Sequence, residues 1–216
     1  MTPPPASAPS PTIAGRGLRY VALGDSYTIG TATRMEGERW PNQLVERLGG
    51  RSPALELIEN LAVNGFTSRD VIEIELPQLE GLRPEFVSLL IGVNDVVQGV
   101  PEDTYQANTV TILDDLLGRV ARERIVSVGI PDYTVTPQGA AFGDPARQSL
   151  AIRRNNTIMR ELAAARRITF VDVYDVSIRA GDDRTLVADD GLHPSGAQYA
   201  LWVDRIAPVV ARLVEA

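Results

Sequence analysis

Short apolar runs alternate with amphipathic stretches from residue 17 to the end of the chain, and this alternation constrains the fold more than any other feature. Apolar runs of this length, separated by helical patterns, are typical of parallel strands that helices cover on both faces. The sequence therefore predicts an α/β fold with three layers, α/β/α, around a five-stranded parallel sheet. The expected strands are residues 18–23, 55–59, 86–91, 125–129 and 168–173.

Two stretches have the periodicity of amphipathic helices. Ile112, Leu116 and Val120 recur at four-residue steps and form one apolar stripe, which we expect to pack on the sheet. We expect the last helix to start at Pro194, because proline is favoured in the first helical turn. Its apolar stripe consists of Tyr199, Trp202, Val203, Ile206, Val209, Val210 and Leu213.

Length and composition predict one compact domain. The chain has 216 residues, of which 44% are hydrophobic, and a chain of this size can bury most of the surface that its unfolded form exposes. Residues 1–16 are rich in proline, alanine and serine and lack periodicity. We therefore expect a flexible tail over residues 1–16 and a single domain over residues 17–216.

Charge and hydropathy exclude several classes of partner. A formal net charge of -7 argues against nucleic acid, which needs concentrated positive charge. The apolar runs are shorter than the roughly 20 residues of a membrane span. Because the first residues lack the basic and apolar regions of a secretory signal, we expect a cytoplasmic protein, with secretion as the alternative if a signal has been removed. Oligomeric state stays open.

Polar residues cluster directly after the apolar runs, where parallel sheets bind their ligands. Gly-Asp-Ser-Tyr (24–27), Asn-Leu-Ala-Val-Asn-Gly (60–65) and Gly-Val-Asn-Asp (92–95) follow the first three expected strands. Asp-Gly-Leu-His-Pro (190–194) precedes the last helix. In order and spacing, these segments together resemble the four sequence blocks of the SGNH/GDSL hydrolases. The resemblance covers nearly the whole chain after the tail and implies the flavodoxin-like SGNH hydrolase fold and a GDSL-type esterase or lipase.

The residues themselves also point to nucleophilic catalysis. A serine hydroxyl is a poor nucleophile unless a base takes its proton, and the chain has only one histidine. If Ser26 is the nucleophile, His193 must be its base, and Asp190 is close enough in sequence to orient the imidazole ring. A structural interpretation is the alternative, with Ser26 as a helix N-cap and His193 and Asp190 as turn residues.

The resemblance further implies an oxyanion hole formed by the backbone N–H groups of Ser26 and Gly65 and the side-chain amide of Asn94. Such donors stabilise the tetrahedral oxyanion of acyl transfer, although an ordinary turn also explains Gly65. No cofactor is implied. Tyr27 stands where the family commonly has leucine, and Ala62 stands where it often has glycine. Neither departure removes a reacting group.

Residues after the third and fourth expected strands are candidates for the substrate pocket. From their position alone we expect Val96, Val97 and Tyr133 to line the acyl site. A plain surface connection is the alternative for residues 131–148, which contain Tyr133. We expect Asp95 to brace its loop rather than to react.

A group of carboxylates near the last helix superficially resembles a metal site. A solvated loop is the better interpretation, since neither EF-hand spacing nor a further histidine accompanies these residues, and we expect no metal. The residues are Asp182, Asp183, Asp189 and Asp190.

The sequence therefore predicts a serine hydrolase that cleaves a small carboxylic ester, with a short acyl or O-acetyl group, through an acyl-enzyme. An acyl thioesterase or a lysophospholipase is the alternative within the enzyme class, because the same triad serves all of these reactions. A noncatalytic carbohydrate-binding module is the alternative outside it.

Overall fold

The computed structural model describes residues 16–215, and these contain a five-stranded sheet in which every pairing is parallel. The predicted fold class and all five predicted strands are confirmed, with strand ends shifted by at most two residues. Of the predicted tail, residues 1–15 lie outside the described residues. The strands are β1 (Leu18–Gly24), β2 (Leu55–Asn60), β3 (Phe86–Leu90), β4 (Ile125–Val128) and β5 (Thr169–Val171).

The strands lie in the order β2-β1-β3-β4-β5. From β1 the chain runs to the edge strand β2 and then returns past β1 to β3, so the direction of winding reverses between β1 and β3. In an open parallel sheet, the crevice outside the carboxyl ends of two such strands is the usual ligand site. The topology therefore points to the segments that follow Gly24 and Leu90.

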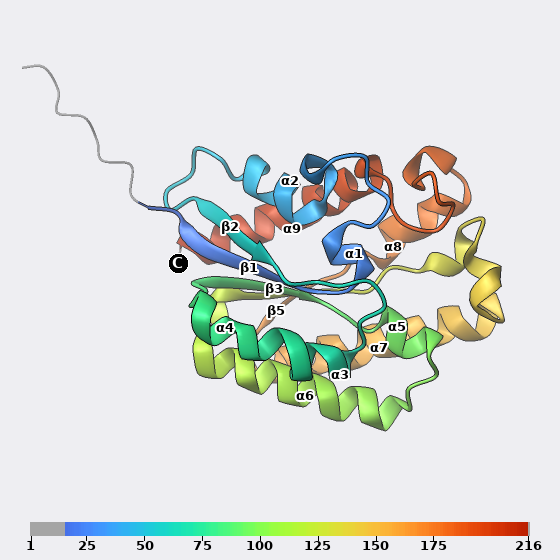
Figure 1. Ribbon diagram of the computed structural model, residues 1–216, viewed down its shortest axis with the longest axis horizontal. Helices are drawn as coiled ribbons and strands as arrows, with labels where there is room; N and C mark the ends of the chain where they lie inside the picture. The colour runs from blue at the N-terminus through green and yellow to red at the C-terminus, as the bar shows by residue number, and fades with distance from the viewer. Residues whose placement is uncertain (1–15, 216) are drawn as a thin grey trace, which may run out of the picture.

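Helices cover both faces of the sheet, as Figure 1 shows. Helices α2 (Trp40–Arg47) and α9 (Gly196–Glu215) lie on one face. The helical segment α3 (Ser68–Asp70), η2 (Val71–Glu75) and α4 (Leu76–Leu82) lies on the other with α6 (Glu102–Arg119) and α7 (Pro145–Ala165).

The alternation of side chains along β1 divides the core into two layers. Tyr20 and Ala22 are fully buried among the side chains of α2 and α9. Val21 and Leu23 are fully buried on the opposite face, among those of α4 and α6. Because both faces are covered, the central strands carry apolar residues at nearly every position, and this made them visible in the sequence.

The two predicted helices are present, and one of them starts later than expected. Ile112 and Leu116 are fully buried in α6, as their spacing predicted. The prediction that the last helix starts at Pro194 is wrong, because Pro194 pairs with Val187 in an antiparallel bridge. Helix α9 begins at Gly196 instead, so the chain from 187 to 194 is free to form a loop.

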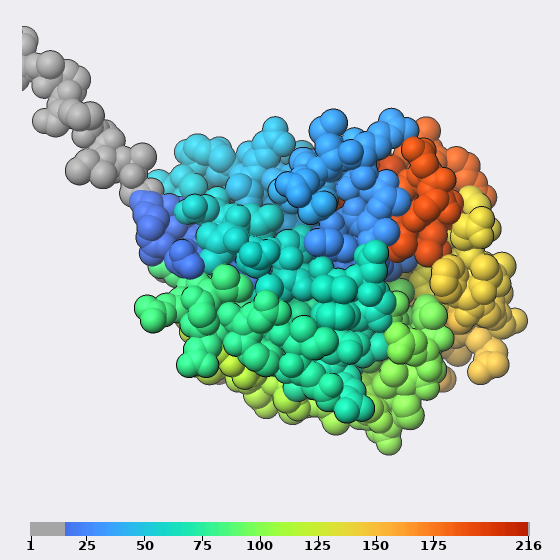
Figure 2. Space-filling model, in the orientation of Figure 1, coloured from blue at the N-terminus to red at the C-terminus, as the bar shows by residue number. Residues whose placement is uncertain are grey.

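Short elements at the carboxyl ends of the strands complete the architecture, namely α1 (Ser26–Ile29), α5 (Val93–Val97), α8 (Tyr174–Ser177) and the 3-10 turns η1 (Glu36–Glu38), η4 (Tyr133–Val135), η5 (Gly139–Phe142), η6 (Ile178–Gly181) and η7 (Arg184–Leu186). One further 3-10 turn, η3 (Arg122–Arg124), directly precedes β4. In Figures 1 and 2, the yellow segment 131–148 and the orange-red loop 182–193 lie side by side at this end of the molecule. A hydrogen bond from the Gln138 amide to the Gly191 carbonyl oxygen (3.0 Å) joins them. Of the helices in residues 16–215, none is long and apolar enough to cross a bilayer.

Candidate active site

The turn after β1 presents Ser26 at the first position of a short helix. Asp25 is the N-cap of α1, and its carboxylate accepts a hydrogen bond from the Tyr27 amide (3.0 Å). The interpretation of Ser26 as an N-cap is therefore wrong, and its side chain is not needed for capping. Its backbone N–H is at a helix start, where amides lack partners within the helix.

Gly24 is required at the end of β1 for steric reasons. Its φ is +147°, and a Cβ atom there would stand 2.2 Å from the Leu90 carbonyl oxygen and 2.6 Å from Thr28 Oγ1. No side chain larger than hydrogen fits without moving backbone. The close approach of β1 and β3 therefore sets where Ser26 lies relative to the segment after β3.

Asp190 and His193 form a hydrogen-bonded pair in the loop before α9. The carboxylate Oδ2 of Asp190 lies 2.6 Å from His193 Nδ1, and its Oδ1 accepts the amides of Leu192 (2.9 Å) and His193 (3.0 Å). Partial burial raises the pKa of Asp190, but these bonds lower it further, and the net pKa is below the usual value. The ionised carboxylate therefore holds the ring with Nε2 as the free nitrogen.

One small cavity of about 40 Å³ brings together residues that are far apart in the sequence. Ser26, Asn94 and His193 all line it, and they come from α1, α5 and the loop before α9. The remaining wall is mostly apolar and consists of Tyr27, Val93, Val97, Tyr133, Phe142 and Leu192. The cavity thus combines a hydroxyl, an imidazole and an amide with room for a small apolar group.

Asn94 and Gly65 lie in adjacent segments. The side-chain amide of Asn94 donates to the carbonyl oxygen of Phe66 (2.9 Å), which ties the block after β3 to the block after β2. Gly65 is exposed, has a φ of +83° and accepts a bond from Gln98 Nε2 (3.1 Å) at its carbonyl oxygen. Gly65 is not among the residues that line the cavity, whereas Ser26 and Asn94 both are, and Gly65 is linked to Asn94 through its neighbour Phe66.

Asp95 braces this region, as predicted. Its carboxylate is buried and accepts hydrogen bonds from the backbone amide (2.9 Å) and the hydroxyl of Ser68 at the start of α3. The bonds join α5 to the helical segment below it. Asp95 therefore fixes the orientation of α5, which carries Asn94.

Tyr27 supports His193 in a way that the sequence did not reveal. Its ring is buried and packs against that of His193, with centroids 5.3 Å apart, and on its other side it stacks on Trp202 of α9 (6.5 Å). The departure from the family's usual leucine was visible in the sequence, but the contact depends on how α9 packs. The tyrosine ring thus limits where the imidazole can move.

The predicted substrate residues divide between two cavities. Val97 and Tyr133 line the 40 Å³ cavity as expected, and Phe142 meets the Tyr133 ring edge-on at 5.8 Å. Val96 does not line it, which corrects the prediction. Neighbouring residues of a helix point in different directions, and Val96 faces an adjacent cavity of about 390 Å³, to which Val97 also contributes.

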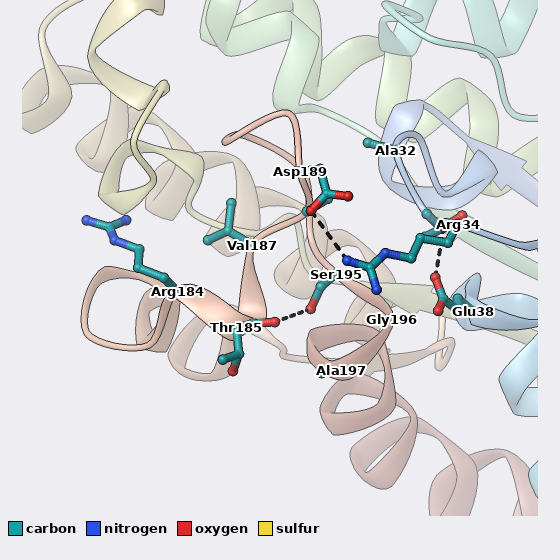
Figure 3. A pocket seen from close by; sticks show the side chains of 12 residues that line it. Ala32, Arg34, Glu38, Arg184, Thr185, Val187, Asp189, Ser195, Gly196 and Ala197 are labelled. Carbon is teal, nitrogen blue, oxygen red and sulfur yellow. Dashed lines mark hydrogen bonds and ion pairs between the residues drawn. The ribbon is translucent and has the colours of Figure 1, made fainter.

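A third cavity, of about 490 Å³, lies beside the loop that carries the histidine and is shown in Figure 3. Arg34, from the segment after α1, reaches across it to Asp189 (3.5 Å). Glu38 and Arg184 also line it, so its wall is charged. Both members of the ion pair are mostly exposed, and such pairs contribute little to stability.

The carboxylates around residues 182–190 serve the loop itself. Asp183 caps a 3-10 turn by accepting the Thr185 amide (3.0 Å), and Asp190 holds His193. Within residues 16–215 no cluster of three potential metal ligands is present. These hydrogen bonds of Asp183 and Asp190 lie within the loop.

Sequence comparison places the chain in a family. The profile of the GDSL-like lipase/acylhydrolase family matches residues 22–201, a span that contains every block described above. The chain belongs to this family. GDSL-type enzymes are ester hydrolases, and this chain is therefore a hydrolase of that type. No curated protein sequence matches it.

Solved structures of GDSL-type enzymes share the fold at low sequence identity. An acetylxylan esterase from Geobacillus stearothermophilus has a TM-score of 0.69 and 20% identity, with 95% of this chain and 97% of that chain covered. A lipase/acylhydrolase from Enterococcus faecalis has a TM-score of 0.70 and 20% identity, covering 90% and 96%. A member of the lipolytic G-D-S-L family from Veillonella parvula has 0.71 and 17%, covering 90% and 98%.

Proposed function

We propose that this GDSL-like acylhydrolase cleaves a small carboxylic ester with Ser26 as nucleophile, His193 as general base and Asp190 as the partner of the histidine. The observation that supports this most directly is that Ser26 and His193 line one cavity while Asp190 holds the other ring nitrogen at 2.6 Å. In a serine triad the base lies beside the nucleophile and an acid holds its other ring nitrogen, and this arrangement supports such a triad. They favour a catalytic role over the alternative of two turn residues and a helix cap.

In the first half of the reaction, the Ser26 hydroxyl oxygen attacks the ester carbonyl carbon while His193 Nε2 takes its proton. The carbonyl electrons move to the oxygen, and the resulting oxyanion is met by the Ser26 N–H, the Gly65 N–H and the Asn94 amide. When the carbon–oxygen bond to the alcohol breaks, the imidazolium returns the proton to that alcohol. In the second half, water replaces serine as the nucleophile and releases the acid.

The cavity beside Ser26 favours a short acyl group. About 40 Å³ is room for only a few heavy atoms, since a single water needs about 10 to 15 Å³ on the same measure. Val97, Tyr133 and Phe142 form an apolar wall suited to a methyl or short alkyl group. An acetyl or similarly short ester therefore fits better than the long chain of a lysophospholipid or fatty acyl thioester. The similarity in fold to an acetylxylan esterase is compatible with this choice.

A panel of p-nitrophenyl acetate, butyrate and octanoate and one acyl thioester tests the proposal with wild type and Ser26→Ala. We expect turnover to be greatest on acetate and to be lost in Ser26→Ala, and a fluorophosphonate probe should label Ser26. Equal turnover by the two proteins, or a label elsewhere, contradicts the nucleophile assignment. Preference for the thioester or for octanoate, with Ser26→Ala inactive, would establish the alternative substrate class instead.

Tyr133→Ala tests the acyl wall separately. Removing this ring enlarges the cavity, so we expect the preference to move from acetate toward butyrate or longer chains, while Ser26 still reacts with the fluorophosphonate. Phe142→Ala, at the ring that Tyr133 contacts, should act in the same direction. An unchanged chain-length profile in both variants contradicts this wall.

A further inference from the structure

Glu75 is a fully buried carboxyl group that the triad does not use. It ends η2, a π-helical turn between α3 and α4, and such turns are frequent at functional sites. Its Oε2 accepts a hydrogen bond from the backbone N–H of Gly24 (3.0 Å), which is 51 residues away in sequence. A buried carboxyl with no ion pair is costly to keep, so its position calls for a physical explanation.

The end of β1 explains why Gly24 needs this acceptor. The last pairing of β1 with the edge strand β2 is Ala22 with Asn60, after which the β2 chain leaves the sheet. Gly24 therefore extends past its neighbour on that side, and its N–H has no strand carbonyl to bond. The Glu75 carboxyl oxygen takes the place of the missing strand.

This bond lies directly beneath the nucleophile. Gly24 is two residues before Ser26, and its positive φ is one that residues with a side chain rarely adopt. The turn is fixed by the hydrogen bond to Glu75 and by the lack of space at Gly24, where a Cβ atom would stand 2.2 Å from the Leu90 carbonyl oxygen. Any rotation of the Gly24 peptide would move the Ser26 hydroxyl and N–H together, and both are aimed at the substrate carbonyl in the proposed reaction.

The surroundings favour a neutral Glu75. Three buried oxygens around Gly24 have no hydrogen-bond partner among the described residues, and they are Asp25 Oδ2, Thr28 Oγ1 and Glu75 Oε1. The net pKa of Glu75 is raised to about 9, mainly by burial and also by the nearby carboxyl groups of Asp25 and Asp70, while the hydrogen bond from the Gly24 N–H acts in the opposite direction. Burial also raises the pKa of Asp25 to about 8. Below its pKa, Glu75 is a carboxylic acid, which keeps one oxygen to accept from Gly24 and carries one O–H donor.

We propose that Glu75 is a positioning residue of the acyl-transfer reaction, which fixes the turn carrying Ser26 by accepting a hydrogen bond from the Gly24 N–H. This inference rests on the proposed function of Ser26. It gives a role in catalysis to a residue of η2, which lies outside the four sequence blocks of the family. Glutamine should replace Glu75 well, because its amide offers the same acceptor and a donor in place of the acid O–H.

Kinetics of Glu75→Met and Glu75→Gln test the proposal on p-nitrophenyl acetate. Methionine fills a similar volume without the acceptor, and we expect kcat to fall about 10- to 100-fold with little change in KM, since small misplacements of reacting groups cost about that much. Glu75→Gln should keep kcat within about threefold of wild type. Glu73 on the same helix is exposed and serves as the matched control, so Glu73→Met and Glu73→Gln should both behave as wild type.

The outcomes separate the two proposals. If folded Glu75→Met retains wild-type kcat, or if folded Glu75→Gln loses as much kcat as Glu75→Met, the positioning role is wrong. Should Glu75→Met fail to fold, Glu75→Gln alone decides, because a folded but tenfold slower protein would overturn the role. In either case an inactive Ser26→Ala keeps the triad proposal intact, whereas an active Ser26→Ala defeats the triad itself.

Discussion

Replacing Glu75 by glutamine should make the stability of the protein depend less on pH. The pKa of Glu75 is raised by burial from its ordinary value of 4.5 to about 9 in the folded chain. Between these values the folded state holds a proton that the unfolded state has released. The contribution of Glu75 to the free energy of unfolding is therefore fully present below about pH 4.5 and is lost progressively as the pH rises toward 9.

The size of the effect follows from proton linkage. While the folded chain binds one proton more than the unfolded chain, the free energy of unfolding falls by about 1.4 kcal/mol per pH unit. From about pH 6 to about pH 8 the wild type should thus lose roughly 2 to 3 kcal/mol through Glu75, and Glu75→Gln should not. For a chain of this length the difference corresponds to roughly 5 to 10 °C in Tm.

Thermal melts of wild type, Glu75→Gln and Glu73→Gln at about pH 6, 7 and 8 measure this difference. Asp25 titrates in all three proteins, so its contribution cancels in the comparison to first order. We expect the Tm of Glu75→Gln to rise relative to that of wild type as the pH increases. The Tm of Glu73→Gln should show the same pH dependence as that of wild type. Parallel Tm curves for Glu75→Gln and wild type would refute the reasoning, since they would mean that Glu75 is already ionised in the folded protein.

Three further substitutions test the site. Asn94→Ala removes an oxyanion donor and should lower kcat by about 10² to 10³ with little change in KM in steady-state assays. Asp190→Asn frees the histidine to take the wrong tautomer and should lower kcat by about 10³ to 10⁴, whereas the exposed neighbour Asp189→Asn should remain active. Gly24→Ala forces a Cβ to within 2.2 Å of a carbonyl oxygen and should cost about 2 to 4 kcal/mol in denaturant unfolding, whereas Gly81→Ala, with open space around it, should not.

The sheet could be predicted from the sequence because burial on both faces leaves a direct mark on composition. A strand such as β3 is buried at every position, and all of its residues except Ser88 are apolar. The order of the strands in the sheet could not be predicted in this way, since the residues of one strand do not indicate which strand lies next to it. The reversal between β1 and β3, which locates the crevice, became visible only in the folded chain.

The reacting groups could also be predicted, because few residue types can do this chemistry and the chain has one histidine. Ser26, His193 and Asn94 were singled out from the sequence, and the structure brings them to one cavity. The start of the last helix was predicted wrongly at Pro194, because a proline suits a β-bridge in a loop as well as a first helical turn. Val96 was predicted wrongly, because its direction depends on the helical phase of α5.

By itself, the sequence determined the strands and the family and singled out the candidate reacting side chains, since these depend on residue type and local spacing. Only the tertiary structure decided what surrounds those side chains. Tyr27 reaches His193 because α9 packs behind α1, and Glu75 reaches Gly24 because a π-helical turn carries it under the end of β1. A glutamate in a helix is ordinarily exposed. Glu75 differs because its carboxyl group accepts a hydrogen bond from Gly24, 51 residues away, and local sequence does not encode such a contact.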